Sequence, residues 1–110
     1  MKTVEIDGAA VKDEVSFHQT FRDALGFPDF YGHNFDAWID CMGYLDDPAA
    51  GMSSIHVGPG EVLVLVVDNA SQFKEQSPAL WHAFLECAAF VNWRCTSRGA
   101  PPILVVSAYA

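Results

Sequence analysis

Asp36 and Asp40 are the residues of this sequence whose type and spacing most directly suggest chemistry. They stand four positions apart, which places both carboxylates on one side of a helix. Paired carboxylates can exchange protons with a substrate, can bind a cationic group, or can form a solvated acidic face. No base, nucleophile or metal-ligand set stands near them in the sequence. We therefore do not expect an enzyme, and on spacing alone a solvated face is favoured over a binding face.

The remaining chemically versatile residues do not form a recognisable motif. The three cysteines, Cys41, Cys87 and Cys95, are an odd number without a C-x-x-C pair, which favours reduced and mostly buried thiols. The four histidines, His18, His33, His56 and His82, lack the i, i+3 or i+4 spacing of metal ligands, and for His18 and His82 we expect surface or edge positions in helices. Gly58-Pro59-Gly60 precedes a strand and is typical of a turn rather than a phosphate loop. We expect no metal and no cofactor.

The charge of the chain is negative and unevenly distributed. The formal net charge is -8, and no Lys or Arg occurs between Arg22 and Lys74. An acidic surface repels nucleic acid, so we expect no nucleic-acid partner. It attracts a basic protein, although the same acidity could serve only to keep the protein soluble. Charge alone leaves these two interpretations open.

The elements that must position Asp36 and Asp40 follow from the hydrophobic pattern. The 110 residues predict one α/β domain, 1–110. We expect strands at 2–6, 61–67 and 103–106, and a loop at 46–60. We expect helices from an Asp13 cap to Gly26, over 34–45 and 69–76, and from a Ser77 cap through Val91. This order predicts a small parallel sheet, and the apolar run at 62–67 is typical of a strand covered on both faces.

The helix expected over 34–45 is amphipathic. On a helical wheel its apolar arc consists of Cys41, Leu45, Trp38, Met42, Phe35 and Ile39. Asp36, Asp40 and Gly43 lie on the opposite side, and Phe35 and Ile39 lie at the rim nearest the aspartates. The sequence therefore predicts an acidic face on a helix whose other face, including Trp38, packs in the core.

Neither a membrane span nor a signal peptide is indicated by the sequence. No apolar run reaches the ~18 residues that a membrane-spanning helix needs. The first residues, MKTVEIDG, lack the apolar segment of a signal peptide. We expect a cytoplasmic protein without a membrane partner.

A longer segment carries a resemblance to a known family. FHQTFRDALGFPDFYGHNFDAWIDCM, residues 17–42, resembles the barstar family of intracellular inhibitors of barnase-type ribonucleases. The shared landmarks are H-Q-T, the L-x-x-P turn, an aromatic pair before Gly32, N-x-D-A and D-C. Similar strands at LVLVV and ILVVS, and the intervening QFKEQS, extend the resemblance over most of the chain. The resemblance implies a barstar-like fold, with a three-stranded parallel sheet and about four helices.

The same resemblance implies a function and a site. The partner would be an extracellular-type, guanyl-specific ribonuclease, bound by a monomer whose acidic helix and preceding loop mimic RNA phosphate. Asp40 would be the central carboxylate, with Asp36 beside it and Glu86 as a supporting acid from a later helix. The implied partner-binding residues are Phe30, Tyr31, Gly32, Asn34, Phe35, Asp36, Ile39, Asp40, Gly43, Tyr44 and Glu86.

Several positions depart from the family pattern. Phe30 stands where the family often has Tyr, and Phe35 replaces Leu. Trp38 and Ile39 reverse the family's Leu-Trp order, and Gly43-Tyr44-Leu45 replaces Thr-Gly-Trp. The 46–60 loop is also longer than expected. These departures favour a related but different ribonuclease as the target, or a family member that has lost inhibition. The alternative function is a barstar-like interaction module that binds a different basic protein.

Overall fold

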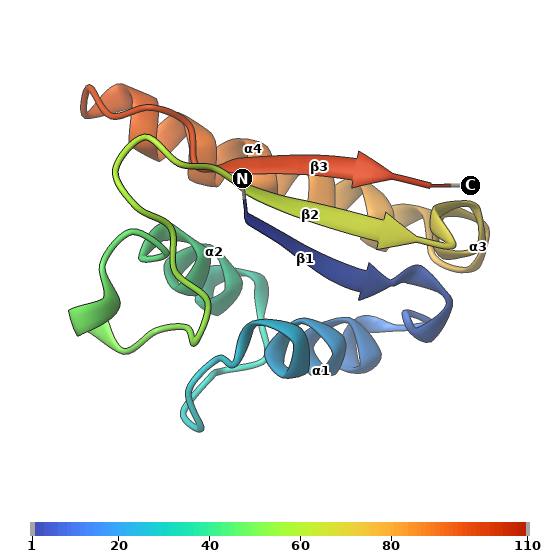
Figure 1. Cartoon of the computed structure of the whole chain (residues 1–110). Helices are drawn as coiled ribbons and strands as arrows, with labels where there is room; N and C mark the ends of the chain where they lie inside the picture. The colour runs from blue at the N-terminus through green and yellow to red at the C-terminus, as the bar shows by residue number, and fades with distance from the viewer. Residues whose placement is uncertain (1, 110) are drawn as a thin grey trace.

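The computed structural model describes residues 2–109. Along the chain, single strands alternate with pairs of α-helices (Figure 1). The elements in chain order are β1 (Lys2–Asp7), the 3-10 turn η1 (Gly8–Ala10), α1 (Glu14–Leu25), α2 (Phe35–Gly43), the 3-10 turn η2 (Pro48–Ala50), β2 (Leu63–Asp68), α3 (Ala70–Gln76), α4 (Pro78–Ser97) and β3 (Leu104–Ala108). The predicted order of strands and helices is confirmed, and the two 3-10 turns are additions to it.

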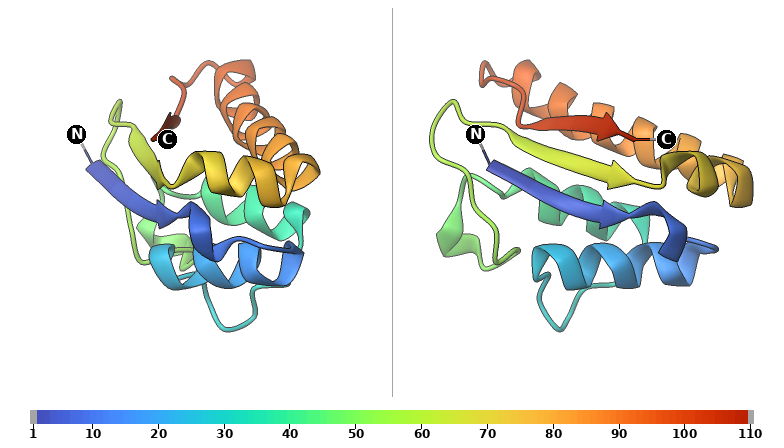
Figure 2. Two further views of the ribbon diagram at one scale, coloured as in Figure 1. Left: turned by 90° about the vertical axis from the view of Figure 1, so that its right-hand side faces the viewer. Right: turned by 45° about the vertical axis from the view of Figure 1, so that its right-hand side comes forward.

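The sheet is parallel, with strand order β1-β2-β3. Crossover connections between parallel strands have the same hand. When each new strand is added on the same side of the previous one, the helices of all crossovers therefore lie on one face of the sheet. Figure 2 shows the helices gathered on a single side of the sheet. Leu65 on that side is fully buried, whereas Val105 on the other side is 45% exposed. The helices therefore cover one face of β2 and not both, although Val64, the β2 partner of Val105 on the other face, is only 8% exposed.

The ends of α1 and the start of α4 test the predicted capping residues. The Asp13 side chain accepts a hydrogen bond from Ser16 N at 2.8 Å in a capping box, as predicted in outline. Gly26 ends α1 in the left-handed region, with φ 66°. Ser77 precedes α4, but its hydroxyl donates to the Lys12 carbonyl at 2.8 Å instead of capping the helix. Ser77 thus occupies the N-cap position and Pro78 is the first helical residue, as predicted, although the Ser77 side chain makes no capping hydrogen bond. The helix continues past Val91 to Ser97.

Aromatic side chains fill the space between the sheet and α2. Trp38 is fully buried, with ring centroids 5.6 Å from Phe21 of α1 and 6.0 Å from Phe84 of α4. Phe17 adds a further contact to Trp38 from α1. The prediction that Trp38 belongs to the core is confirmed. Because α2 is anchored from both neighbouring helices, the direction of its solvent-facing side is fixed by packing.

The 46–60 loop is attached to the ends of α1 and α2. Ser54 N donates to the Leu25 carbonyl at 2.9 Å, and Val57 N donates to the Leu45 carbonyl at 3.0 Å. A Cβ at Gly26 would overlap the Ser54 side chain, so glycine is needed there for space as well as for its positive φ. The loop therefore closes the end of the molecule at which α2 terminates (Figure 1).

Candidate partner-binding face on α2 and α4

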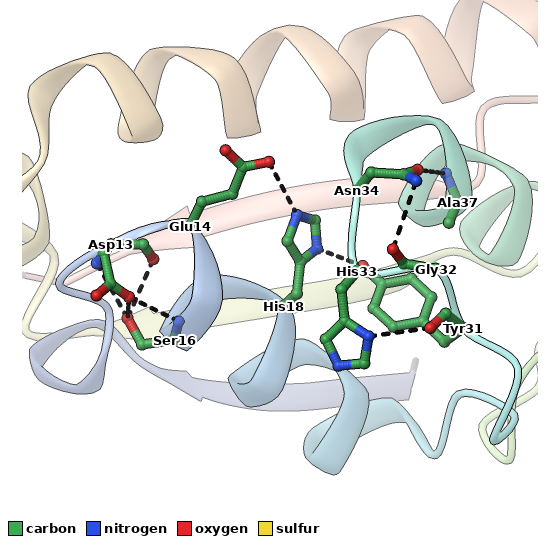
Figure 3. Close-up of polar contacts among 9 residues, drawn as sticks. All are labelled: Asp13, Glu14, Ser16, His18, Tyr31, Gly32, His33, Asn34 and Ala37. Atoms are coloured by element: carbon green, nitrogen blue, oxygen red, sulfur yellow. Dashed lines mark hydrogen bonds and ion pairs between the residues drawn. The ribbon is translucent and has the colours of Figure 1, made fainter.

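Asp36 and Asp40 project from the solvent-facing side of α2. Asn34 begins this helix by accepting a hydrogen bond from Ala37 N at 2.8 Å (Figure 3). Trp38 and Cys41 are buried on the opposite side. Both aspartates are exposed, and Asp36 lies in the first turn, where the helix dipole favours a negative charge. The structure thus presents two carboxylates from a helix whose rotation is set by its core.

Glu86 lies on α4, which packs beside α2. Its carboxylate is exposed and lies 3.0 Å from Nε2 of His82. Burial raises the pKa of the neighbouring Cys87 thiol, and the negative charges of Glu86 and Asp36 raise it further. Glu86 thus adds an exposed carboxylate from the helix that packs beside α2.

Asp40 is paired within the molecule. Its Oδ1 lies 3.5 Å from Nη1 of Arg94, and both side chains are about half exposed, at 56% and 50%. The Arg94 guanidinium also lies 5.8 Å from the centroid of the exposed Phe90 ring. The sequence reasoning missed Arg94 because the predicted helix stripe was followed only to Val91. The nearest signal was the spacing Glu86, Phe90, Arg94, which places these three side chains along one side of a helix.

A groove of about 450 Å³ opens between the C-terminal ends of α2 and α4. Three residues predicted to bind a partner, Ile39, Gly43 and Tyr44, come together there with Asp40. The lining residues are Ile39, Asp40, Gly43, Tyr44, Asp46, Asp47, Val91, Arg94, Cys95 and Arg98. The groove therefore carries both signs of charge, which the acidic composition of residues 23–73 did not suggest.

The loop before α2 separates its two aromatic residues. Phe30 is 74% exposed, whereas Tyr31 is only 5% exposed. The Tyr31 ring packs on Phe27, with centroids 4.8 Å apart, and its hydroxyl lies 2.5 Å from Nδ1 of His18 (Figure 3). Tyr31 was expected on the contact surface, but its ring is buried and offers a partner little area. Its expected position is corrected accordingly. Phe30 remains available.

His18 is fully buried, so its expected surface or edge position is also wrong. Burial lowers the pKa of His18, and the Glu14 carboxylate, 3.6 Å from Nε2, opposes that shift. Burial also raises the pKa of Tyr31. Because Nε2 faces the Glu14 carboxylate, we assign the ring proton to Nε2, and in this tautomer the Tyr31 hydroxyl donates to Nδ1. The contact joins the loop to α1 and is structural.

Phe35, Gly32 and Asn34 take different positions around the start of α2. Phe35 is half-buried, with ring centroids 5.3 Å from Phe17 and 5.2 Å from His18, so it packs mainly against the core. Gly32 and Asn34 are exposed, and Asn34 Nδ2 donates to the Gly32 carbonyl at 3.4 Å. Together they hold the turn between Phe30 and the first acidic residue of α2.

Other kinds of site find little support within residues 2–109. No group of three or more His, Cys, Asp or Glu side chains there is arranged to hold a metal ion. Over the same residues, no helix has the length and apolar character needed to cross a membrane. Burial, together with the charge of Asp40, raises the pKa of the Cys41 thiol to about 11, which does not suit a nucleophile.

Comparison with known proteins gives two findings. Residues 1–107 match the sequence profile of the family described as "Barstar (barnase inhibitor)". A stretch of 49 residues is 41% identical to the "Putative ribonuclease inhibitor YrdF" of Bacillus subtilis (strain 168). That similarity covers 44% of this chain and 54% of the Bacillus protein, so the chain spans about half the length of this relative.

Proposed function

The chain belongs to the barstar family, and we propose that it is a protein inhibitor of a small, basic, barnase-like and guanyl-specific ribonuclease. In this proposal the acidic side of α2 and the loop before it enter the active-site groove of the ribonuclease. Such a groove is cationic because it must hold RNA phosphate. Asp40 takes the place of a phosphate and pairs with a cationic side chain of the enzyme.

The observation that carries the proposal is the exposure of Asp36 and Asp40 on a helix oriented by the buried Trp38. A charge-assisted hydrogen bond to a carboxylate is stronger than a neutral one and can be bidentate when the donor is Arg. The net charge of -8 would raise the rate of encounter with a basic protein. Position and charge therefore both favour a cationic partner over a passive solvated face.

The proposed contact surface consists of those predicted partner-binding residues that are exposed or partly exposed to solvent, except Phe35, which packs mainly against the core. Tyr31 and Phe35 support this surface from beneath rather than forming it. The proposed contact residues are Phe30, Gly32, Asn34, Asp36, Ile39, Asp40, Gly43, Tyr44 and Glu86. Phe30 would supply an aromatic anchor at one end, and Tyr44 a second at the other.

We further propose that the protein is not an enzyme, that it acts as a monomer, and that it works in the cytoplasm. Inhibition by occlusion needs only a surface complementary to the ribonuclease groove. The 1:1 complex would protect the cell that makes the ribonuclease.

A second candidate is a barstar-like interaction module for a different basic protein. The observation that favours it is the groove between α2 and α4, where Arg94 and Arg98 stand beside the aspartates. A partner with both cationic and anionic groups would match this groove better than a uniformly basic one. Recovery of a non-nuclease partner from a lysate at low salt, lost on Asp40→Asn, would favour this candidate.

The proposal is tested by titrating the protein against a panel of guanyl-specific ribonucleases. We expect stoichiometric loss of RNA cleavage for at least one enzyme, and a 1:1 complex on a sizing column. Absence of inhibition across the panel at micromolar excess would refute the proposal.

A further inference from the structure

Arg94 is a cation placed directly beside the proposed central carboxylate. Its Nη1 lies 3.5 Å from Oδ1 of Asp40, and half of the side chain is exposed. It therefore stands where a cation of the partner would have to approach. No other Arg or Lys forms an ion pair with Asp36 or Asp40 within residues 2–109.

The surroundings of Arg94 hold it in this position. Its guanidinium lies over the Phe90 ring, one turn earlier on α4, at 5.8 Å from the centroid. The backbone of α4 fixes the base of the side chain against α2. A docking partner could turn the guanidinium aside but could not remove its charge from the interface.

An exposed ion pair of this kind contributes little to stability, so a partner can displace it. The displaced cation then lies close to the cation that replaces it, and like charges brought together across an interface disfavour the complex. A carboxylate can accept from two donors at once, but two cations on one carboxylate still repel each other. A partner that offers an acceptor group to Arg94 avoids this repulsion.

We propose that Arg94 competes within the molecule for the Asp40 carboxylate and thereby determines which basic partner the acidic face accepts. This inference rests on the proposed function. Arg94 weakens binding to a uniformly basic groove. It is compatible with a basic groove that carries a carboxylate or carbonyl oxygen opposite α4. Such discrimination by an unfavourable contact is a common source of specificity in protein interfaces.

The test compares inhibition constants of five proteins against one barnase-type ribonuclease with a uniformly basic active site. They are the native protein, Arg94→Met, Arg98→Met, Asp40→Asn and the double variant Asp40→Asn with Arg94→Met. Methionine keeps an unbranched apolar chain near Phe90 while it removes the charge. Arg98 is the matched control, because it lines the same groove and forms no ion pair with Asp40 within residues 2–109. Circular dichroism confirms that each variant is folded.

We expect Arg94→Met to tighten inhibition by about tenfold and Arg98→Met by about twofold. Within the described part of the chain, Arg98 forms no ion pair with Asp40, and its hydrogen bond to Arg94 is to the main-chain carbonyl and not to the guanidinium. In the Asp40→Asn background, the gain from Arg94→Met should fall to the level of the Arg98 control. Inhibition by Arg94→Met alone, with an inactive native protein, would also support the inference.

Native inhibition that Arg94→Met leaves unchanged or weakens would overturn the inference and leave the proposed function intact. If neither the native protein nor any variant inhibits, the proposed function fails and the inference fails with it. The two failures are therefore distinguishable from the same set of titrations.

Discussion

The Tyr31 hydroxyl lies 2.5 Å from Nδ1 of the buried His18, so the loop that precedes α2 is bonded to the interior of α1. Phe30, the residue before Tyr31, is 74% exposed. The contact with His18 divides the aromatic pair before Gly32 into one residue that supports the loop and one that faces solvent.

Tyr31→Phe should destabilise the protein by about 1–3 kcal/mol, because it leaves the buried Nδ1 of His18 without its donor. The ring itself is retained, so the packing against Phe27 should persist. Urea unfolding measures the free energy. We expect the inhibition constant of the folded variant to change little. An unchanged unfolding free energy would contradict the structural role of this hydroxyl.

Phe30→Ala should have the opposite pattern. The side chain is 74% exposed, so its removal should alter the unfolding free energy by no more than about 0.5 kcal/mol. If Phe30 is an anchor at the interface, the inhibition constant should rise by about tenfold. Titration of the ribonuclease with this variant and with Tyr31→Phe separates the two roles. Equal inhibition by Phe30→Ala and the native protein would remove Phe30 from the contact surface.

The stability of the protein should depend on the protonation of His18. Its pKa in the folded state lies below the ordinary value of 6.5, chiefly because of burial, while His33 also lowers it and Glu14 raises it. The unfolded chain therefore binds a proton more readily. The contribution of neutral His18 is complete above about pH 6.5 and decreases as the pH falls from there toward the lower folded pKa.

His18→Gln should reduce this loss of stability between about pH 7 and pH 5, and Glu14→Gln should enlarge it, because Glu14 favours the protonated imidazole. Unfolding free energies of the three proteins at both pH values provide the measurement. The same pH dependence in all three would show that His18 does not titrate as described.

Trp38 should be essential for stability and have no direct contact with a partner. Trp38→Ala should cost about 3–5 kcal/mol because it opens a cavity between α1, α2 and α4. Trp38→Phe should cost less, since it also removes a buried indole N–H that has no hydrogen-bond partner within residues 2–109. Thermal unfolding of both variants checks the order. A smaller loss for alanine than for phenylalanine would contradict the packing described.

The features that could be predicted from the sequence are those with a local signal. Asp13 and Gly26 mark the ends of α1 through capping and backbone conformation, and helical periodicity separates Trp38 from the two aspartates of α2. The alternation of strands and helix pairs predicted the parallel sheet. For the helix ends and for the two sides of α2, the deciding residues stand within about one turn of each other in the chain.

The features that were missed depend on contacts between distant segments. The one-sided sheet follows from the strand order, which the apolar run of β2 does not encode. Tyr31 lies in an irregular loop without periodicity, so nothing in its neighbours shows that it turns inward to His18. Arg94 meets Asp40 only because α4 extends past Val91 and packs along α2.

The central claim is that Asp40 replaces a phosphate of the RNA substrate, and inhibition by Asp40→Asn tests it most directly. This substitution keeps the shape of the side chain and removes its charge. The matched control is Asp23→Asn, which removes the same charge from an exposed position on α1. With a ribonuclease that the native protein inhibits, we expect Asp40→Asn to raise the inhibition constant by about 100-fold or more and Asp23→Asn by about twofold at most. Similar inhibition constants for the two variants would contradict the account.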